Sequence, residues 1–341
     1  MSSLITNDGA MPLGARIYVA GHRGLAGSAI VRKLQDRGYR NLLLRTHAEL
    51  ELTDQAVTRA FFEREKPDYV FLAAAKVGGI LANNTYPAEF ILSNLAVQTN
   101  VIHDAYRAGV KRLIFLGSSC VYPRDCPQPI KEDYLLTGPL EVTNRPYAVA
   151  KIAGIEMCWS YNRQYGTKFL AAMPTNLYGP GDNYDLQNSH VLPALIRKCH
   201  EAKQAPNHQS PITNHQPPVV LWGTGAPRRE FLYSDEMADA GVFLMNLPDD
   251  QYQSLITSHD SPPLINIGCG EDLSIKELAE IVAKVVGFQG SLRFDTSKPD
   301  GTPRKLLDVS RLRALGWRSE ITLVHGLTLA YRDFLDRGGH A

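Results

Sequence analysis

A tyrosine and a lysine four residues apart, Tyr147 and Lys151, form the pair in this sequence that is best suited to acid–base chemistry. On a helix, residues four apart share a face, so the lysine ammonium would lie beside the tyrosine hydroxyl and favour its ionised form. A phenol whose pKa is lowered toward neutrality can give its proton to an alkoxide formed as hydride reaches a carbonyl. The same spacing is common on exposed helices, so the pair indicates catalysis only together with other features of the chain.

A glycine-rich turn near the N-terminus is the first of these other features. The apolar run 17–20 predicts a buried strand, and 25–34 carries apolar residues at helical spacing. Gly21, Gly24 and Gly27 fall in the turn between them. The first would permit a tight turn, the second would let backbone amides approach a pyrophosphate, and the third would let helix and strand pack closely. We therefore predict a dinucleotide site, with a plain structural turn as the alternative.

The end of the next predicted strand, 41–44, bears on which dinucleotide is bound. A site that prefers NAD usually has a carboxylate here for the ribose hydroxyls, whereas this chain continues with Arg45, Thr46 and His47. Arg23 and Arg45 could bind a 2′-phosphate, so we predict NADP(H) as the cofactor. The alternative for either arginine is a solvated surface charge.

Composition restricts the partners. The chain has 341 residues, 36 basic and 35 acidic, with a net charge of +1 and no long basic run, so we predict a small-molecule partner rather than nucleic acid. No apolar stretch reaches membrane-spanning length, and no secretory signal opens the chain. Five cysteines without a CxxC pair argue against a disulfide framework and against a zinc site, which favours a cytoplasmic location.

Alternating strand and helix patterns define the expected fold. Apolar runs at 69–73, 113–116 and 169–173 alternate with helical patterns at 89–108 and 147–165, which predicts an α/β fold with a doubly wound, Rossmann-like parallel sheet. Two later helical patterns, 234–247 and 274–286, each open on a serine that can cap. We expect a flexible tail at 1–15 and an NADP-binding domain at 16–177, to which parts of 230–268 return. A smaller C-terminal α/β substrate domain covers 178–335, with a mobile loop or lid at 202–218.

Polar residues follow the predicted strands, where ligands bind in open parallel sheets. Ser118 and Cys120 are two apart on a segment expected to be extended, so both could face one substrate. Ser118 could donate to a carbonyl oxygen and Cys120 could act as a base if its thiolate were stabilised, although a buried turn of small residues is the simpler interpretation. The segment 174–180 is expected to form a wall of the pocket. His190 could exchange protons or cap a helix.

Several of these segments together resemble the extended short-chain dehydrogenases that act on nucleotide sugars. They are GHRGLAGSAI, SSCVYP, YAVAK and PTNLYGPGDN. Longer strings are similar to the GDP-L-fucose synthase family of epimerase-reductases, namely AAAKVGGILANNTYPAEFI, SNSHVLPALIRK, WGTGAPRREF and DTSKPDGTPRKLLD. The likeness runs from about residue 16 to residue 335.

The resemblance implies two reactions in one pocket. GDP-4-keto-6-deoxy-D-mannose would first be epimerised at C3 and C5, the two carbons that flank its C4 ketone. NADPH would then reduce this ketone to give GDP-L-fucose. Cys120 and His190 match the base and acid of the family. Ser118 and Tyr147 would polarise the ketone, and Tyr147 with Lys151 would protonate the product alkoxide.

The resemblance also implies binding residues. Those expected at the cofactor are Gly21, His22, Arg23, Gly24, Leu25, Ala26, Gly27, Arg45, Leu116, Gly117, Lys151, Pro174, Asn176, Leu177 and His190. Those expected at the GDP-sugar are Lys198, Trp222, Arg229 and Lys298. Lys198 stands where the family has an arginine, so it lacks the bidentate fork. Arg228 beside Arg229 leaves open which of the two binds the diphosphate.

Other functions remain open at this stage. A 4,6-dehydratase would need an acid pair where Ser119 and Cys120 stand, and a 4-epimerase that retains its cofactor would have no need of a Cys–His pair. A non-catalytic binding protein could keep the fold without keeping Ser118, Tyr147 and Lys151 together. The resemblance further implies a homodimer that contacts through the helices at 89–108 and 147–165.

Overall fold

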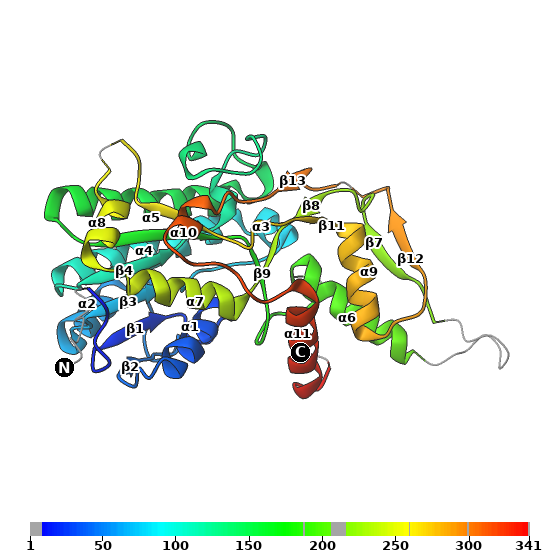
Figure 1. Cartoon of the computed structure of the whole chain (residues 1–341), viewed down its shortest axis with the longest axis horizontal. Coiled ribbons are helices and arrows are strands. Elements are labelled where there is room, and N and C mark those ends of the chain that lie inside the picture. Colours follow the sequence, from blue (N-terminus) through cyan, green and yellow to red (C-terminus); the bar gives the residue numbers. More distant parts are fainter. Residues whose placement is uncertain (1–8, 187, 206–215, 259, 299, 340–341) are drawn as a thin grey trace, which may run out of the picture.

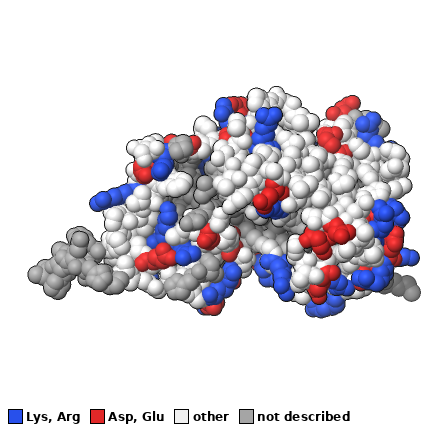
Figure 2. Space-filling model, turned by 180° about the vertical axis from the view of Figure 1, so that it is seen from behind, with Lys and Arg blue, Asp and Glu red and all other residues white. Residues whose placement is uncertain are grey.

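The computed structural model describes residues 9–186, 188–205, 216–258, 260–298 and 300–339. The chain forms a larger part around one central sheet and a smaller part beside it, with short strands between the two (Figure 1). Lys and Arg are interspersed with Asp and Glu over the face seen in Figure 2, as expected for a chain with a net charge near zero.

The central sheet has six parallel strands in the order β10-β5-β4-β3-β1-β2. Its strands are β1 (Ile17–Ala20), β2 (Leu42–Leu43), β3 (Tyr69–Leu72), β4 (Arg112–Leu116), β5 (Phe169–Pro174) and β10 (Leu264–Ile267). Every residue of β1, β3, β4, β5 and β10 is buried, which is typical of a parallel sheet covered on both faces. The predicted α/β, Rossmann-like fold is confirmed.

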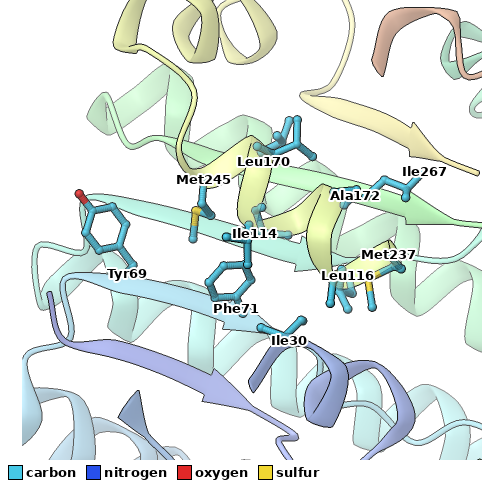
Figure 3. Close-up of a cluster of buried hydrophobic side chains, with 14 of the residues drawn as sticks. Ile30, Tyr69, Phe71, Ile114, Leu116, Leu170, Ala172, Met237, Met245 and Ile267 are labelled. Carbon is cyan, nitrogen blue, oxygen red and sulfur yellow. The ribbon is translucent and has the colours of Figure 1, made fainter. Parts of the chain in front are cut away.

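Helices cover both faces of this sheet. On one face lie α1 (Leu25–Asp36), α7 (Ser234–Met245), α8 (Asp249–Ile256) and α10 (Ser310–Ala314). Ile30 of α1 and Met237 of α7 pack there on Phe71 and Ile114 (Figure 3). On the other face, α2 (Gln55–Glu65), α4 (Pro87–Arg107) and α5 (Arg145–Tyr165) bury a second cluster against the alternate strand residues.

The smaller part has its own core. Helices α6 (Val191–Gln204), α9 (Ile275–Val286) and α11 (Leu323–Asp336) pack with the parallel strand pair β7 (Val219–Trp222) and β12 (Leu292–Asp295). Leu195, Leu278 and Leu327, one from each helix, are almost fully buried in it.

Two small sheets connect the parts. One joins β6 (Asn176–Tyr178) to β9 (Phe231–Tyr233) in parallel. The other has the order β11-β8-β13, from β8 (Arg228–Arg229), β11 (Leu273–Ser274) and β13 (Arg304–Lys305). The short helix α3 (Ile80–Thr85) and the 3-10 turns η1 (Ser119–Val121), η2 (Glu132–Tyr134) and η3 (Val142–Asn144) complete the described elements. Figure 1 shows β8 and β13 side by side between the two parts.

Two expectations about the fold are wrong. The N-terminal segment is not loose as far as residue 15, because Met11 and Ala15 are buried and the Met11 amide donates to Asn246 Oδ1 at 2.9 Å. Ser274 caps α9 in a capping box, but Ser234 is the first residue inside α7 and caps nothing. Residues 206–215 of the predicted loop lie outside the described residues.

Candidate active site

The glycine-rich turn between β1 and α1 leaves room beside backbone amides. Gly21 has φ +81°, which side chains disfavour, and a methyl group on Gly27 would lie 2.1 Å from the Gly21 carbonyl oxygen. Gly24 is the N-cap of α1, and no side chain caps the helix there. The first amides of a helix have no intrahelical partner and carry its positive end, so this turn fits a pyrophosphate.

The two arginines near this turn have different surroundings. Arg23 is exposed on the turn itself. The Arg45 guanidinium already pairs with Glu65 at 3.1 Å and lies 5.8 Å from the centre of the Phe61 ring. Burial, followed by the Arg23 charge, lowers the pKa of His22. Arg45 would therefore have to share its charge between a 2′-phosphate and Glu65.

Ser118 and Cys120 follow β4, and the chain brings their side chains together by a turn rather than by extension. Ser118 is extended, but η1 begins at the next residue, and the Ser118 hydroxyl accepts from the Cys120 amide at 3.4 Å. The expected extended segment is wrong, because a 3-10 turn wraps Cys120 back over Ser118. Ser118 also lowers the pKa of both the Cys120 thiol and the Tyr147 hydroxyl, against the larger effect of burial.

Tyr147 and Lys151 lie on the first turns of α5, but the ammonium does not act on the phenol as expected. Lys151 Nζ donates to the Leu116 carbonyl at 2.8 Å and lies 4.6 Å from the centre of the Phe115 ring. It is 5.8 Å from the centre of the Tyr147 ring. Burial and then the Cys120 charge raise the pKa of Tyr147, while Ser118 opposes them. The expected lowering of this pKa is therefore wrong for the structure.

The raised pKa still suits a proton donor, because a phenol must be neutral before it can give up its proton. Burial also lowers the pKa of Lys151 to about 8. Leu116, whose carbonyl accepts from Lys151, ends β4, and Gly117 follows it. A methyl group on Gly117 would lie 2.1 Å from Met173 Cε, so the Met173 side chain would have to move to admit it.

The wall predicted at 174–180 takes the form of two strands. Pro174 ends β5, and Asn176 and Leu177 belong to β6, where both are half-buried. Asn176 Nδ2 donates to the Glu230 carbonyl at 2.8 Å, which ties β6 to the neighbouring β9. The end of β5 adjoins Gly117, whose amide donates to the Ala172 carbonyl at 2.8 Å.

A lysine that sequence reasoning missed, Lys305, lies among the acid–base residues. Burial raises the pKa of the Cys120 thiol, and the Lys305 charge is the foremost effect that opposes it. Burial and then the Lys305 charge lower the pKa of His190. His190 is the N-cap of α6 and its side chain makes no cap hydrogen bond. The His190 residue is exposed to solvent.

Arg228 and Arg229 point in different directions, which bears on the ambiguity left by the sequence. Arg228 Nε donates to Asp272 Oδ1 at 3.0 Å, on the outer side of the three-stranded sheet. Arg229 donates to the Thr302 carbonyl at 2.6 Å, and burial lowers its pKa. The Arg229 charge also lowers the pKa of Lys305, after the larger effect of burial.

The remaining predicted binding residues gather on the smaller part. Trp222 is 66% exposed at the end of β7, and Lys298 Nζ lies 5.6 Å from the centre of its ring. Lys198 of α6 donates to the Val220 carbonyl on the same strand at 3.0 Å. The structure thus makes two clusters. The catalytic cluster is Ser118, Cys120, Tyr147, Lys151, His190 and Lys305, and the surface cluster is Lys198, Trp222 and Lys298.

Comparison with known proteins gives the class to which this arrangement belongs. The chain belongs to the NAD dependent epimerase/dehydratase family, whose model matches residues 17–268. In the described residues, no helix is both long enough and apolar enough to cross a membrane.

Individual relatives are closer. The chain is 58% identical over 322 residues to putative GDP-L-fucose synthase 2 of Arabidopsis thaliana, covering 94% of this chain and 92% of the relative. It is 53% identical over 323 residues to the GDP-L-fucose synthase of Escherichia coli strain K12, covering 94% and 97%. Among solved structures, MlghC, a GDP-mannoheptose C4 reductase from Campylobacter jejuni with NADP bound, has a TM-score of 0.85 at 43% identity, covering 96% of this chain and all of that one.

Proposed function

We propose that the chain is a GDP-L-fucose synthase. It epimerises GDP-4-dehydro-6-deoxy-α-D-mannose at C3 and C5, and it reduces the C4 ketone with NADPH. The observation that carries this proposal is the meeting of two sets of groups in one cluster. Ser118 and Tyr147 suit ketone reduction, and Cys120 and His190 suit proton exchange on carbon. The names of the relatives at 53–58% identity support the same activity.

Each group has a defined task in this proposal. Ser118 and Tyr147 donate to the ketone oxygen, which stabilises the negative charge that develops when a neighbouring C–H loses its proton. Cys120 removes that proton, and His190 supplies one to the opposite face. In the reduction, the neutral Tyr147 hydroxyl gives its proton to the new alkoxide. One oxyanion site therefore serves both reactions.

We assign NADP(H) to the larger part of the molecule. The cradle of Gly21, Gly24 and Gly27 fits its pyrophosphate, and Arg23 is the exposed arginine for the 2′-phosphate. NADPH supplies the hydride that reduces the ketone. Lys151, which donates to the Leu116 carbonyl, would offer a positive charge to the bound cofactor.

We assign the nucleotide sugar to the side that faces the smaller part. The exposed Trp222 ring, with Lys298 above it, offers a flat surface for a guanine base. Arg229 is placed to meet the diphosphate by charge-assisted hydrogen bonds. Lys198 keeps a positive charge near Val220 and can add a single contact.

A homodimer in the cytoplasm completes the proposal. Helices α4 and α5 pack on each other, and Leu92 on α4 is 70% exposed. Tyr106 and Tyr165 from the two helices stack with ring centres 4.3 Å apart at the surface. Such an apolar and aromatic surface supports pairing of two copies, which light scattering would test. All five cysteines are free thiols, which supports a reducing compartment.

One experiment separates this function from its neighbours. The purified protein is mixed with GDP-4-keto-6-deoxy-D-mannose and NADPH in deuterated water, nicotinamide absorbance is followed, and the sugar product is identified. Loss of NADPH with deuterium at C3 and C5 and GDP-L-fucose as the product is the expected result. Reduction without deuterium would leave a C4 reductase, the activity named for MlghC. No loss of NADPH would contradict both.

A further inference from the structure

Tyr122 ends the turn that carries Cys120 and reaches a distant strand of the central sheet. It is the C-cap of η1, two residues after Cys120, and it is almost fully buried. The Tyr122 hydroxyl donates to Asn266 Oδ1 at 2.6 Å. Asn266 lies on β10, and β5 separates β10 from β4, the strand that precedes the turn. This hydrogen bond therefore ties the turn of Cys120 to the β10 edge of the sheet.

The side-chain amide of Asn266 is engaged at both ends. Its Nδ2 donates to the Ile130 carbonyl at 2.9 Å and to the Asp308 carbonyl at 3.1 Å. Two carbonyls at one end require the nitrogen there, so Oδ1 faces Tyr122. An amide oxygen can only accept, so the Tyr122 hydroxyl is the donor. The orientation of this bond is thus fixed by the partners on the other side of Asn266.

Asn266 also joins the turn to the side assigned to the nucleotide sugar. Asp308 follows β13 by three residues, and β13 pairs with β8, the strand of Arg229. The Asp308 amide in turn donates to the Ile130 carbonyl at 2.8 Å. Through Asn266, the turn of Cys120 and the strand of Arg229 are therefore held in one frame.

The phenol of Tyr147, which gives its proton in the proposed reduction, is held by other contacts. It lies on α5, and Phe90 of α4 packs edge-on against its ring, with ring centres 6.4 Å apart. The hydrogen bond of Tyr122 takes no part in this contact. Its loss should therefore disturb Cys120 more than Tyr147.

We propose that Tyr122 is a positioning residue for epimerisation, because its hydrogen bond to Asn266 holds the turn so that the Cys120 thiol meets the sugar C–H. The inference rests on the proposed function, in which Cys120 removes a proton from carbon. Tyr122 exchanges no proton itself, since burial and then the Glu132 charge raise its pKa well above the ordinary value. It acts through Cys120.

Apolar packing alone would control the turn less tightly. Val121, beside Cys120, is buried, but hydrophobic contacts are non-directional and tolerate a sliding turn. A hydrogen bond restricts both distance and direction. A general base must lie within hydrogen-bond reach of the proton that it removes. A small displacement of the turn is therefore enough to slow proton transfer.

The test compares Tyr122→Phe with wild type in deuterated water. The full-length protein is mixed with GDP-4-keto-6-deoxy-D-mannose, and deuterium entry at C3 and C5 is followed by mass spectrometry, first without NADPH and then with it. The variant keeps the ring and loses one oxygen, so Asn266 Oδ1 has no donor.

In Tyr122→Phe we expect kcat for deuterium entry to fall about tenfold to a hundredfold, because the base is misplaced. KM for the GDP-sugar should not change, since the contact of Asn266 with Asp308 remains. NADPH oxidation should fall less than deuterium entry, and the share of unepimerised product should rise. NMR of the sugar product measures that share.

Tyr39→Phe is the matched control, because it removes the same kind of bond elsewhere. Tyr39 is buried, and its hydroxyl lies 3.0 Å from Asn246 Oδ1. It packs in the cluster on the opposite face of the sheet from Tyr122. Both variants should lower the melting temperature by a similar amount, but only Tyr122→Phe should slow deuterium entry. A role in folding alone would change the melting temperature in both and the deuterium rate in neither.

A double-mutant cycle assigns the effect to the bond. Asn266→Ala should slow deuterium entry at least as much as Tyr122→Phe. Adding Tyr122→Phe to Asn266→Ala should then cost little more, because the two residues act through one contact. If Asn266→Ala does not fold, Asn266→Ser takes its place.

Three results would overturn the inference while the proposed function stands. They are unchanged deuterium entry in Tyr122→Phe, an equal fall in deuterium entry and hydride transfer, and additive losses in the double variant. Wild-type protein that takes up no deuterium would instead contradict the proposed function, and the role of Tyr122 would fall with it.

Discussion

The catalytic cluster and the surface cluster differ in how far their lysines are exposed to solvent. Lys151 is 2% exposed and its pKa falls to about 8, whereas Lys298 is exposed and its ammonium lies over the similarly exposed Trp222 ring. A buried charge acts strongly on its neighbours because little water screens it, while an exposed charge acts weakly and can move with a ligand. For the proposed function we infer that the buried cluster carries out proton transfer and that the surface cluster contributes recognition.

Loss of the Tyr147 hydroxyl should have the largest effect if the chemistry is confined in this way. In Tyr147→Phe we expect reduction to slow by about a hundredfold to ten-thousandfold, because the proton donor is gone, with NADPH binding unchanged. Stopped-flow absorbance and nicotinamide fluorescence measure the two properties. Tyr165→Phe, on the exposed end of the same helix, is the matched control. A wild-type rate in Tyr147→Phe would remove this residue from the mechanism.

Replacement of Cys120 should divide the two reactions of the cluster. In Cys120→Ser we expect deuterium entry into the sugar to fall about a hundredfold, because a serine hydroxyl is a much weaker base source than a thiol. NADPH oxidation should fall less, with reduction of an unepimerised ketone. Mass spectrometry and NMR of the product measure this, with Cys269→Ser as the control. Normal deuterium entry would show that Cys120 is not the base.

The two adjacent arginines, Arg228 and Arg229, sharpen the comparison, because one is expected to bind the GDP-sugar and the other to stabilise the fold. In Arg229→Ala we expect KM for the GDP-sugar to rise about tenfold to a hundredfold with kcat less affected, because a charge-assisted contact is lost. Arg228→Ala should instead lower the melting temperature, since Asp272 loses one of its two partners. Steady-state kinetics and thermal unfolding of both variants check this. Reversed phenotypes would exchange the roles.

The smallest expected effect is on stability. The folded chain holds Lys151 with a pKa near 8, below its ordinary value of 10.5, so the unfolded chain binds its proton more tightly. Stability from this group therefore rises as pH increases from about 8 to 10.5, and the full cost of the buried charge is present below pH 8. Lys151→Met should relieve that cost. The lost hydrogen bond to Leu116 offsets part of it, leaving a net gain below about 2 kcal/mol at neutral pH.

Denaturant unfolding of wild type and Lys151→Met across the pH range measures that difference. The gain should shrink between pH 8 and 10.5 as wild type loses its proton. Lys131→Met is the control for removal of an exposed charge. A gain that grows with pH would contradict the assigned direction.

Local patterns made much of the fold predictable. The apolar runs at 69–73, 113–116 and 169–173 correspond to β3, β4 and β5 within one or two residues. Such runs carry their own signal, because a strand buried on both faces must be apolar throughout. The glycine turn was equally predictable from the sequence, because the crowding at Gly27 and the positive φ of Gly21 disfavour other residues at these positions.

The site was less predictable wherever it depends on contacts between distant segments. The sequence did not predict Lys305 as a site residue. Its position depends on the pairing of two short strands that lie 76 positions apart in the sequence, as the register of Arg304 with Arg228 shows. The Lys151 ammonium was misplaced because the Leu116 carbonyl, 35 residues away, lies within its reach. Ser234 failed as a cap because the helix begins at this residue and not after it. Spacing alone cannot specify any of these.

The position of β10 has a consequence for how the chain is made. This strand occupies the edge of the central sheet against β5, yet it comes from residues 264–267, about ninety residues later in the sequence. Until those residues leave the ribosome, β5 presents a row of unpaired amides and carbonyls on a wholly apolar strand. A nascent or truncated chain that ends before residue 264 would therefore be prone to aggregate and would be a substrate for chaperones.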